Sequence, residues 1–255
     1  MNIQSAKIGF LAALTLAAVG CGTKDAPGPL EPSGPTGRVR FVNLITDPTR
    51  VPVNAILEGV PFGAGLGYTA TTPATLPSPA TANYSAILTG TRTLIVKKTA
   101  DTTVTLATIA FPVTASQDQT VYATGGTGGA AVTNFATTDA NPVPTSTQVA
   151  LRIVNMAPSA GALDYFVTAP NADLSTATPT AANIAYQGSS PYLTLAPGTY
   201  QVRAVPAGTL PAARSTSVSV AINSLALAGG TGRTVVTADK AAGGTPIVAF
   251  VLTDR

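Results

Sequence analysis

Two short stretches of this 255-residue chain are nearly copies of one another: RFVNLITDP at residues 40–48 and RIVNMAP at residues 152–158. Each begins with arginine, runs through apolar residues to an asparagine, and soon reaches a proline. β-Branched and aromatic residues favour strands, and proline tends to end them. The two stretches therefore predict an opening strand that occurs twice.

Further similarities follow both stretches in the same order. Each copy continues with a strand-like run, a segment from tyrosine to Gly-Thr, another strand-like run and a final Thr-Asp pair. The matched segments are 53–57 with 163–167, 84–91 with 192–199, 119–122 with 233–236, and 138–139 with 253–254. Such order at nearly constant spacing indicates a tandem duplication. We expect repeats over 38–141 and 149–255, joined by a linker over 142–148.

The composition indicates an all-β fold. Apolar residues make up 45% of the chain and charged residues 10%, so a packed core is expected beneath a largely uncharged surface. Threonine, which fits strands, occurs 40 times, and 24 glycines with 21 prolines interrupt any long helix. With about seven short alternating runs in each copy, we expect two tandem immunoglobulin-like β-sandwiches.

Alternation also assigns strand faces in the second copy. Leu163, Tyr165 and Val167 should lie on one face of their strand, and Asp164 and Phe166 on the other. The short linker over 142–148 is stiffened by proline, so we expect the two domains to stand end to end.

One turn in the second copy is similar to the corner of fibronectin-type modules. There, a tyrosine hydroxyl bonds back to the backbone just upstream, and Tyr200 follows Pro197-Gly198-Thr199 in the corresponding place. The first copy has Arg92 at that position. Its corner must therefore be closed in another way.

These motifs together resemble a bacterial family of exported, often duplicated domains known as domain of unknown function 4397. Its members open with an Arg-Val-Val-Asn-x-x-Pro type stretch, followed by a Val-Asp-Val-Tyr-Val type strand and a Pro-Gly-Thr-Tyr turn. The second copy has counterparts of all three, at 152–158, 163–167 and 197–200. The first copy has Asn54 in place of the aspartate and lacks the turn. The resemblance implies a fold and brings no activity with it.

The first 20 residues predict a signal peptide. A polar start with one cation, Lys7, precedes an apolar run too short to span a bilayer. Ala18-Val19-Gly20-Cys21 resembles the lipobox of bacterial lipoproteins. This implies cleavage between Gly20 and Cys21 and acylation of the Cys21 thiol with a diacylglycerol carrying fatty acids such as palmitate.

Cys21 is the only cysteine in the chain, and residues 21–37 are rich in proline and glycine. They predict a lipidated cysteine followed by a flexible tether. In the enterobacterial lipoproteins that this stretch resembles, an aspartate directly after the acylated cysteine retains the protein in the inner membrane. Gly22 occupies that position here, which favours the outer membrane. Two alternatives remain: a plain secretory signal that leaves an incidental thiol, and an uncleaved anchor.

The residue types argue against catalysis. Histidine is absent, which excludes Ser-His-Asp and Cys-His catalysis and imidazole zinc sites. Carboxylates occur singly along the chain, so we expect no enzyme, no catalytic residue, no cofactor and no metal site. Lysine and arginine are too sparse for a nucleic-acid surface. Glycine clusters at 126–131 and 229–234 precede strands rather than helices, so we expect hairpin loops there.

Two smaller hypotheses concern ions. Asp139 and Asn141 are the closest pair of oxygen donors for a calcium ion, against a plain loop role. Arg40 and Arg152, matched by the repeat, suggest either a ligand clamp or, as we prefer, structural bonds to strand ends or to a carboxylate such as Asp164.

The sequence thus predicts a non-enzymatic, lipid-anchored protein of the cell envelope, held in the membrane through Cys21. We expect a structural, adhesive or ligand-binding module whose partner is an envelope protein or glycan; the oligomeric state is open. Scattered tyrosines suit such contacts but also suit a core: Tyr68, Tyr84, Tyr186 and Tyr192. The alternatives are an accessory subunit or hydrolase of envelope polysaccharide, which two carboxylates converging in a cleft would favour, and a periplasmic spacer.

Overall fold

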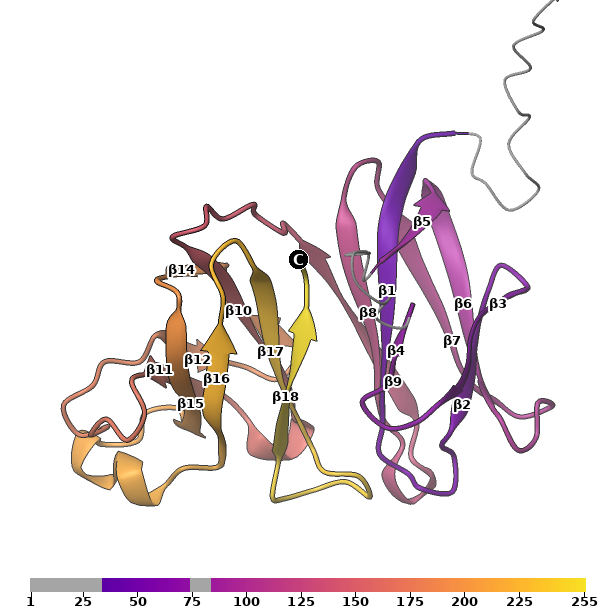
Figure 1. Ribbon diagram of the computed structural model, residues 1–255. Coiled ribbons are helices and arrows are strands. Elements are labelled where there is room, and N and C mark those ends of the chain that lie inside the picture. Colours follow the sequence, from indigo (N-terminus) through magenta and orange to yellow (C-terminus); the bar gives the residue numbers. More distant parts are fainter. Residues whose placement is uncertain (1–33, 74–83) are drawn as a thin grey trace, which may run out of the picture. The chain divides into compact units, whose positions relative to one another are not determined.

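The computed structural model describes residues 34–73 and 84–255, and these described residues form one compact unit (Figure 1). The predicted signal peptide, Gly20 and Cys21 lie outside the described residues, as does most of the predicted tether. Strands dominate the described chain, so the predicted all-β class is confirmed.

The first half of the described chain contains nine strands and one short 3-10 helix. Their bounds are β1 (Thr36–Ile45), β2 (Val53–Leu57), β3 (Val60–Leu66), β4 (Thr71–Thr72), β5 (Ser85–Leu88), β6 (Gly90–Lys98), β7 (Thr105–Val113), β8 (Asp118–Gly125), η1 (Thr127–Gly129) and β9 (Val132–Asp139). The last part of the predicted tether is therefore strand. A side chain at Gly37 would clash with the Thr114 backbone carbonyl, so this glycine permits close packing of β1.

The second half again contains nine strands in the same order. They are β10 (Val149–Met156), β11 (Leu163–Thr168), β12 (Ala181–Ile184), β13 (Gly188–Ser189), β14 (Leu193–Leu195), β15 (Gly198–Pro206), β16 (Val220–Leu227), β17 (Gly232–Ala238) and β18 (Val248–Thr253), with η2 (Pro158–Ala160) and η3 (Pro211–Thr216). Two tandem copies of one fold are thus visible strand by strand.

Both halves pair their strands identically. The first half has an inner sheet in the order β4-β1-β8-β9, with β5 also on β1, and an outer sheet in the order β3-β2-β6-β7. The second half repeats this as β13-β10-β17-β18, with β14 on β10, and β12-β11-β15-β16. Each half is a two-sheet sandwich, as predicted. The immunoglobulin-like detail is not confirmed, because β1 and β10 each lie beside a parallel partner, β8 and β17, in the middle of their sheet.

The repeated asparagine explains why the opening stretch is shared. The side-chain amide of Asn43 donates to the carbonyls of Leu66 and Gly67, 3.0 Å from each. Asn155 donates likewise to Gly161 and Ile184, at 2.8 and 2.9 Å. A buried amide stabilises only when its donors are satisfied, and here it ties the opening strand to the connections beside it.

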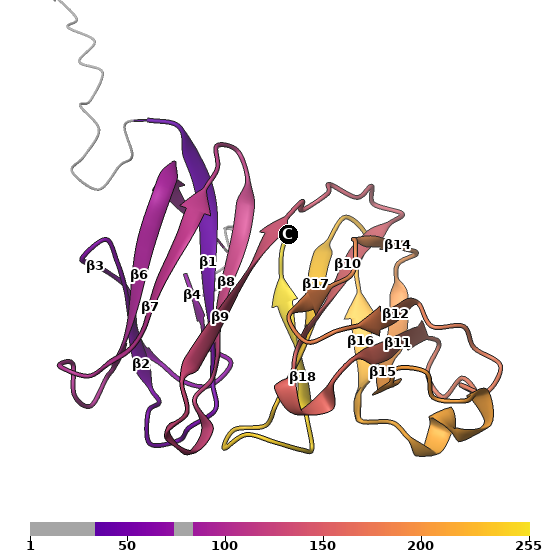
Figure 2. The same cartoon turned by 180° about the vertical axis from the view of Figure 1, so that it is seen from behind.

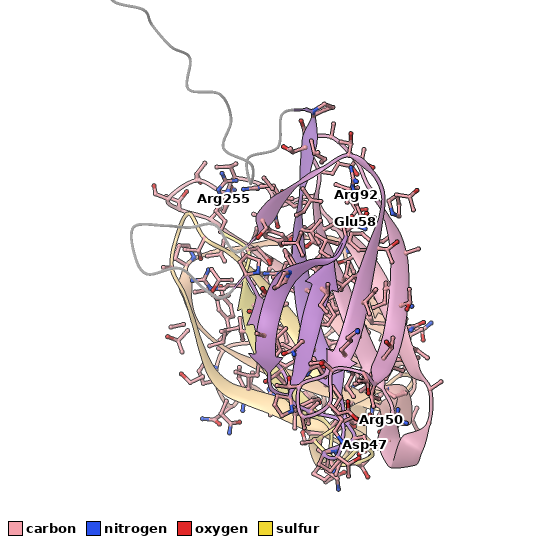
Figure 3. All side chains as sticks on the ribbon, turned by 90° about the vertical axis from the view of Figure 1, so that its right-hand side faces the viewer. Asp47, Arg50, Glu58, Arg92 and Arg255 are labelled. Carbon is pink, nitrogen blue, oxygen red and sulfur yellow. The ribbon has the colours of Figure 1, made fainter. Side chains whose placement is uncertain are left out.

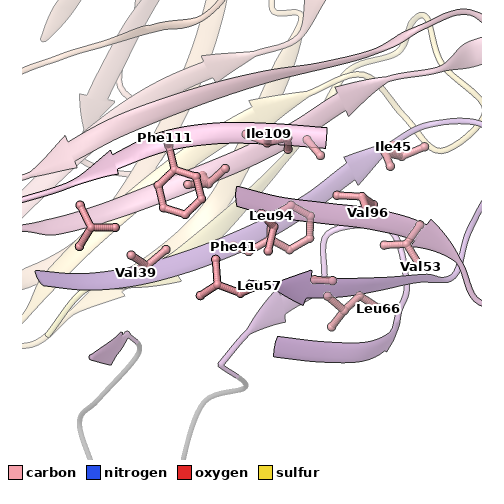
Figure 4. Close-up of a cluster of buried hydrophobic side chains, with 14 residues drawn as sticks. Val39, Phe41, Ile45, Val53, Leu57, Leu66, Leu94, Val96, Ile109 and Phe111 are labelled. Carbon is pink, nitrogen blue, oxygen red and sulfur yellow. The ribbon is translucent and has the colours of Figure 1, made fainter. Parts of the chain in front are cut away.

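Each sandwich has its own apolar core between its two sheets. In the first, Phe41, Leu94 and Phe111 belong to a cluster of buried residues (Figure 4). In the second, Leu163, Tyr165 and Val167 face the core, whereas Phe166 packs on the opposite side of its strand with Leu174 and Val205. The predicted faces of this strand are confirmed.

A third apolar layer lies between the two inner sheets. It includes Val42 and Leu44 from β1 and Val154 and Met156 from β10, all fully buried. The strands β9 and β18 border this contact (Figures 1 and 2). The prediction that the two domains stand end to end was wrong. The outward face of each inner sheet is apolar too, so the two inner sheets pack against each other, and the linker allows this arrangement.

The corner prediction is confirmed in both copies. The Tyr200 hydroxyl donates to the Ala196 carbonyl at 2.8 Å. In the first copy, the Arg92 guanidinium donates to the carbonyls of Leu88 and Thr89, at 2.8 and 2.6 Å. Arginine thus closes the corner that tyrosine closes in the second copy.

Candidate functional site

A cluster of buried charges lies at the contact between the two inner sheets. Arg40 on β1 is paired in register with Thr120 on β8, and Arg152 on β10 with Thr234 on β17. Each guanidinium donates to the hydroxyl of its own threonine, Arg40 at 3.0 and 3.2 Å and Arg152 at 3.3 Å. Both arginines are 2% exposed, so their charges need partners inside the protein.

The partner carboxylates come from the opposite repeat. Arg40 of the first repeat bonds to Asp254 of the second, with 2.9 Å between Nη2 and Oδ1. Arg152 of the second repeat pairs with Asp139 of the first, with 2.6 Å between Nη1 and Oδ1. The predicted structural role of the two arginines is confirmed, since each also bonds to a strand-end carbonyl, Arg40 to Thr253 at 2.8 Å and Arg152 to Thr138 at 3.3 Å. The suggested carboxylate partner Asp164 was wrong. Its carboxylate instead accepts backbone N–H groups, at 2.7 and 3.1 Å.

Two tyrosines complete the cluster from matched positions. The Tyr84 hydroxyl donates to Asp139 at 2.8 Å, and the Tyr192 hydroxyl approaches Asp254 at 3.2 Å. Their rings lie against the guanidinium groups, 4.5 Å from Arg40 and 5.0 Å from Arg152, measured from the ring centroid to Cζ. Cation–π contact adds to the ion pairs when the groups are desolvated.

The pKa shifts fix the charges in this cluster. Burial alone would raise the pKa of Asp139, but the positive charges of Arg152 and Arg40 and two threonine hydroxyls lower it below 3.8. Burial, reinforced by the charge of Asp139, raises the pKa of Tyr84. A general acid or base works best with a pKa near the ambient pH, and both shifts move away from neutrality. The cluster is suited to hold two permanent ion pairs rather than to transfer protons.

Packing within the described residues leaves two polar atoms at this contact unsatisfied. The Tyr122 hydroxyl and Nη2 of Arg152 are buried and have no hydrogen-bond partner there. Tyr122 packs on Phe135, with 6.4 Å between the ring centroids. An unpaired buried hydroxyl costs stability, so this contact is not fully optimised.

The four tyrosines considered for partner contact all take part in this contact. Besides Tyr84 and Tyr192, the Tyr68 hydroxyl of the first repeat donates to the Asp239 carbonyl of the second. Tyr186 of the second repeat lies 3.3 Å from the Thr133 hydroxyl of the first. No sequence motif indicated this; the only hint was that these tyrosines occur at matched places in the two copies.

The two residues suggested as calcium ligands, Asp139 and Asn141, use their side chains for bonds within the protein. Asp139 accepts from Arg152 and Thr137, and the Asn141 side chain donates to Asp118 and accepts from Tyr192. No group of three or more His, Cys, Asp or Glu side chains able to hold a metal occurs within 34–73 and 84–255.

An open hollow of about 590 Å³ lies beside the cluster. Arg38 and Asp118 line it and are joined by two hydrogen bonds, 2.6 and 2.5 Å long. Farther away, Asp47 and Arg50 lie at one end of the first sandwich, with 3.6 Å between Oδ2 and Nε, and Glu58 and Arg92 toward the other (Figure 3). Asp47 and Arg50 form a single, largely covered ion pair, with side chains 9% and 23% exposed. Arg92 and Glu58 each bond to the backbone instead, Arg92 to the Leu88 carbonyl and Glu58 to the Thr93 N–H group.

The two glycine clusters have different roles. Gly126 begins the η1 turn in the β8–β9 hairpin, where the Arg50 guanidinium donates to the Gly129 carbonyl at 2.6 Å. Gly229 and Gly230 instead connect β16 of the outer sheet with β17 of the inner sheet, so the second cluster is a crossover and not a hairpin. Among the described residues, no helix is long and apolar enough to cross a membrane.

Of three comparisons with known proteins, the one with family models agrees with the duplication. No curated protein matches the chain. The crystal structure of a leucine-rich repeat protein from Bacteroides thetaiotaomicron is 14% identical over 81% of this chain. This chain spans 26% of that protein, and the TM-score of 0.18 supports no argument about fold. The model of the family described as "Domain of unknown function (DUF4397)" matches twice, at residues 37–166 and 167–255. The chain therefore belongs to this family and carries two copies of its domain.

Proposed function

We propose that this protein is a non-enzymatic structural module of the cell envelope, held in the outer membrane by fatty acids on Cys21. The body of the module is the two-sandwich unit, and the tether sets its distance from the membrane. Fourteen residues separate Cys21 from Thr36, the first residue of β1. At 3.3 to 3.6 Å per residue, they give a reach of up to about 50 Å.

One observation supports a structural role above the alternatives. Asp139 and Asp254 do converge, as a polysaccharide hydrolase would require, since Nη2 of Arg40 lies 3.9 Å from one and 2.9 Å from the other. They do so between packed sheets, each paired with an arginine, rather than in a cleft open to a polymer. The charges therefore favour cohesion between the two repeats over catalysis.

Metabolic labelling with a fatty-acid analogue tests the anchor. Wild-type protein should take up label and fractionate with the outer membrane, whereas Cys21→Ala should do neither. Thr23→Ala is the matched control, because it changes the same stretch and keeps the thiol. Protease treatment of intact cells then tells whether the module faces outward or into the periplasm. A wild-type protein that takes up no label would contradict the lipidation of Cys21 and would not affect the description of the two-sandwich unit.

Purified residues 32–255 provide the test of the non-enzymatic part. Incubation with isolated envelope polysaccharide should release no soluble fragments. The contrary result would be release of fragments by the wild type that is lost in Asp139→Asn, with circular dichroism showing that the variant is still folded. That result would contradict the structural proposal and favour a hydrolase.

A further inference from the structure

The contact between the two repeats has approximate two-fold character. Arg40 and Arg152 occupy matched positions, as do Asp139, the last residue of β9, and Asp254, the residue that directly follows β18. Each arginine bonds to the aspartate of the other repeat. The same patch therefore meets itself, which is the arrangement that defines an isologous interface between identical subunits.

A second pair of residues follows the same exchange. Tyr68 precedes Thr69, whose backbone N–H donates to Asn43, and Tyr186 precedes Gln187, whose N–H donates to Asn155, both at 2.8 Å. The two tyrosines are thus matched. Each reaches across to the other repeat, Tyr68 to a backbone carbonyl and Tyr186 to a threonine hydroxyl.

The apolar part of the interface is matched as well. Val42 and Val154 hold equivalent places in β1 and β10, as do Leu44 and Met156, and all four are fully buried in the layer between the inner sheets. Apolar burial drives association, and the exchanged charges fix its register.

We propose that this inner-sheet face is a self-complementary docking surface whose partner is another copy of the same domain. Within one chain, the other repeat supplies that copy. Between chains, the first repeat of one molecule docks with the second repeat of a second molecule, and reciprocally. This inference goes beyond the structural role proposed above and does not depend on the lipid anchor.

The linker decides which partner is used. Nine residues separate Asp139 from Val149, so ten Cα steps of about 3.5 Å reach at most about 35 Å. A short connection of this kind gives the attached repeat an effective concentration on the order of millimolar. The closed single chain is thus favoured until the connection becomes too short.

Deleting Pro142–Thr147 from residues 32–255 leaves three linker residues and a reach of about 14 Å. Asn141 and Gln148 are kept, because both make hydrogen bonds beside the interface. Light scattering after size exclusion should show a twofold increase in mass. The control Val143→Gly/Pro144→Ser/Thr145→Gly retains the length and should stay monomeric. A folded, monomeric deletion variant would overturn the proposal.

Charge reversal supplies an independent measurement if the deletion variant does not fold. Arg152→Asp places two aspartates together, and Asp139→Arg places two arginines together, so each variant alone carries one repulsive contact. Mixing them allows an exchanged heterodimer in which every arginine again faces an aspartate. Native mass spectrometry should detect this heterodimer. The combined Arg152→Asp/Asp139→Arg chain should remain a monomer, and a mixture without heterodimer would overturn the proposal.

Discussion

Removing the charge of Asp254 should be among the most destabilising single changes in this protein. Its carboxylate accepts from Arg40 at 2.9 Å and from Thr234 at 2.6 Å. In Asp254→Asn the side chain keeps its shape, but the buried guanidinium groups of Arg40 and Arg152 must then share the single charge of Asp139, at 3.9 and 2.6 Å. Removing one member of a buried pair typically costs about 3–5 kcal/mol, a large part of the roughly 5–15 kcal/mol that stabilises a domain.

Urea unfolding followed by far-ultraviolet circular dichroism measures this cost. The control is Arg38→Met, which breaks an ion pair whose arginine side chain is 49% exposed and should cost at most about 1 kcal/mol. The double variant Arg40→Met/Asp254→Leu removes both charges and should recover most of the loss, because apolar pairs often replace buried ion pairs without penalty.

Two results would refute this reasoning. One is a cost for Asp254→Asn no larger than that for Arg38→Met. The other is strict additivity of the Arg40 and Asp254 substitutions, since groups in direct contact should be coupled by about 0.5–3 kcal/mol.

Three further outcomes are expected. Tyr122→Phe should leave stability unchanged or raise it by up to about 1 kcal/mol, because its hydroxyl has no hydrogen-bond partner among the described residues, whereas Tyr84→Phe should lower it; thermal melts of both variants decide. Because the pKa of Asp139 is lowered in the folded protein, this group contributes stability above pH 3.8 that is lost as the pH falls toward its pKa in the folded state. Urea unfolding at several pH values checks this, since the free energy of unfolding of Asp139→Asn should fall less steeply with decreasing pH. Tyr200→Phe should cost about 0.5–1.5 kcal/mol by the same melts, and no change would mean that the corner bond is dispensable.

The fold class and the duplication could be predicted because both depend on local patterns. Alternation around Tyr165 and the matched RFVN and RIVN stretches needed no knowledge of distant contacts. The contact between the inner sheets was missed although β1 indicated it: Phe41 and Val42 are adjacent and apolar, as are Leu44 and Ile45, so both faces of this strand are buried. A strand with one solvent-facing side would alternate instead.

The charged cluster was beyond sequence reasoning for a different reason. Arg40 and Asp254 are 214 positions apart and come from different repeats, so no spacing rule connects them. Within each repeat the carboxylates occur singly along the chain, so neither repeat alone predicts a pair. Asp139 and Asp254 meet only because the two copies pack face to face.

The exchange of aspartates between the repeats also affects how this chain can evolve. A mutation at Arg40 cannot be compensated by its own repeat at Asp139 without disturbing Arg152, so its natural compensation lies at Asp254. The two halves of the duplicated gene are therefore bound to change together at these positions. Recombination that brings in a half from a diverged relative would join faces whose charges no longer match.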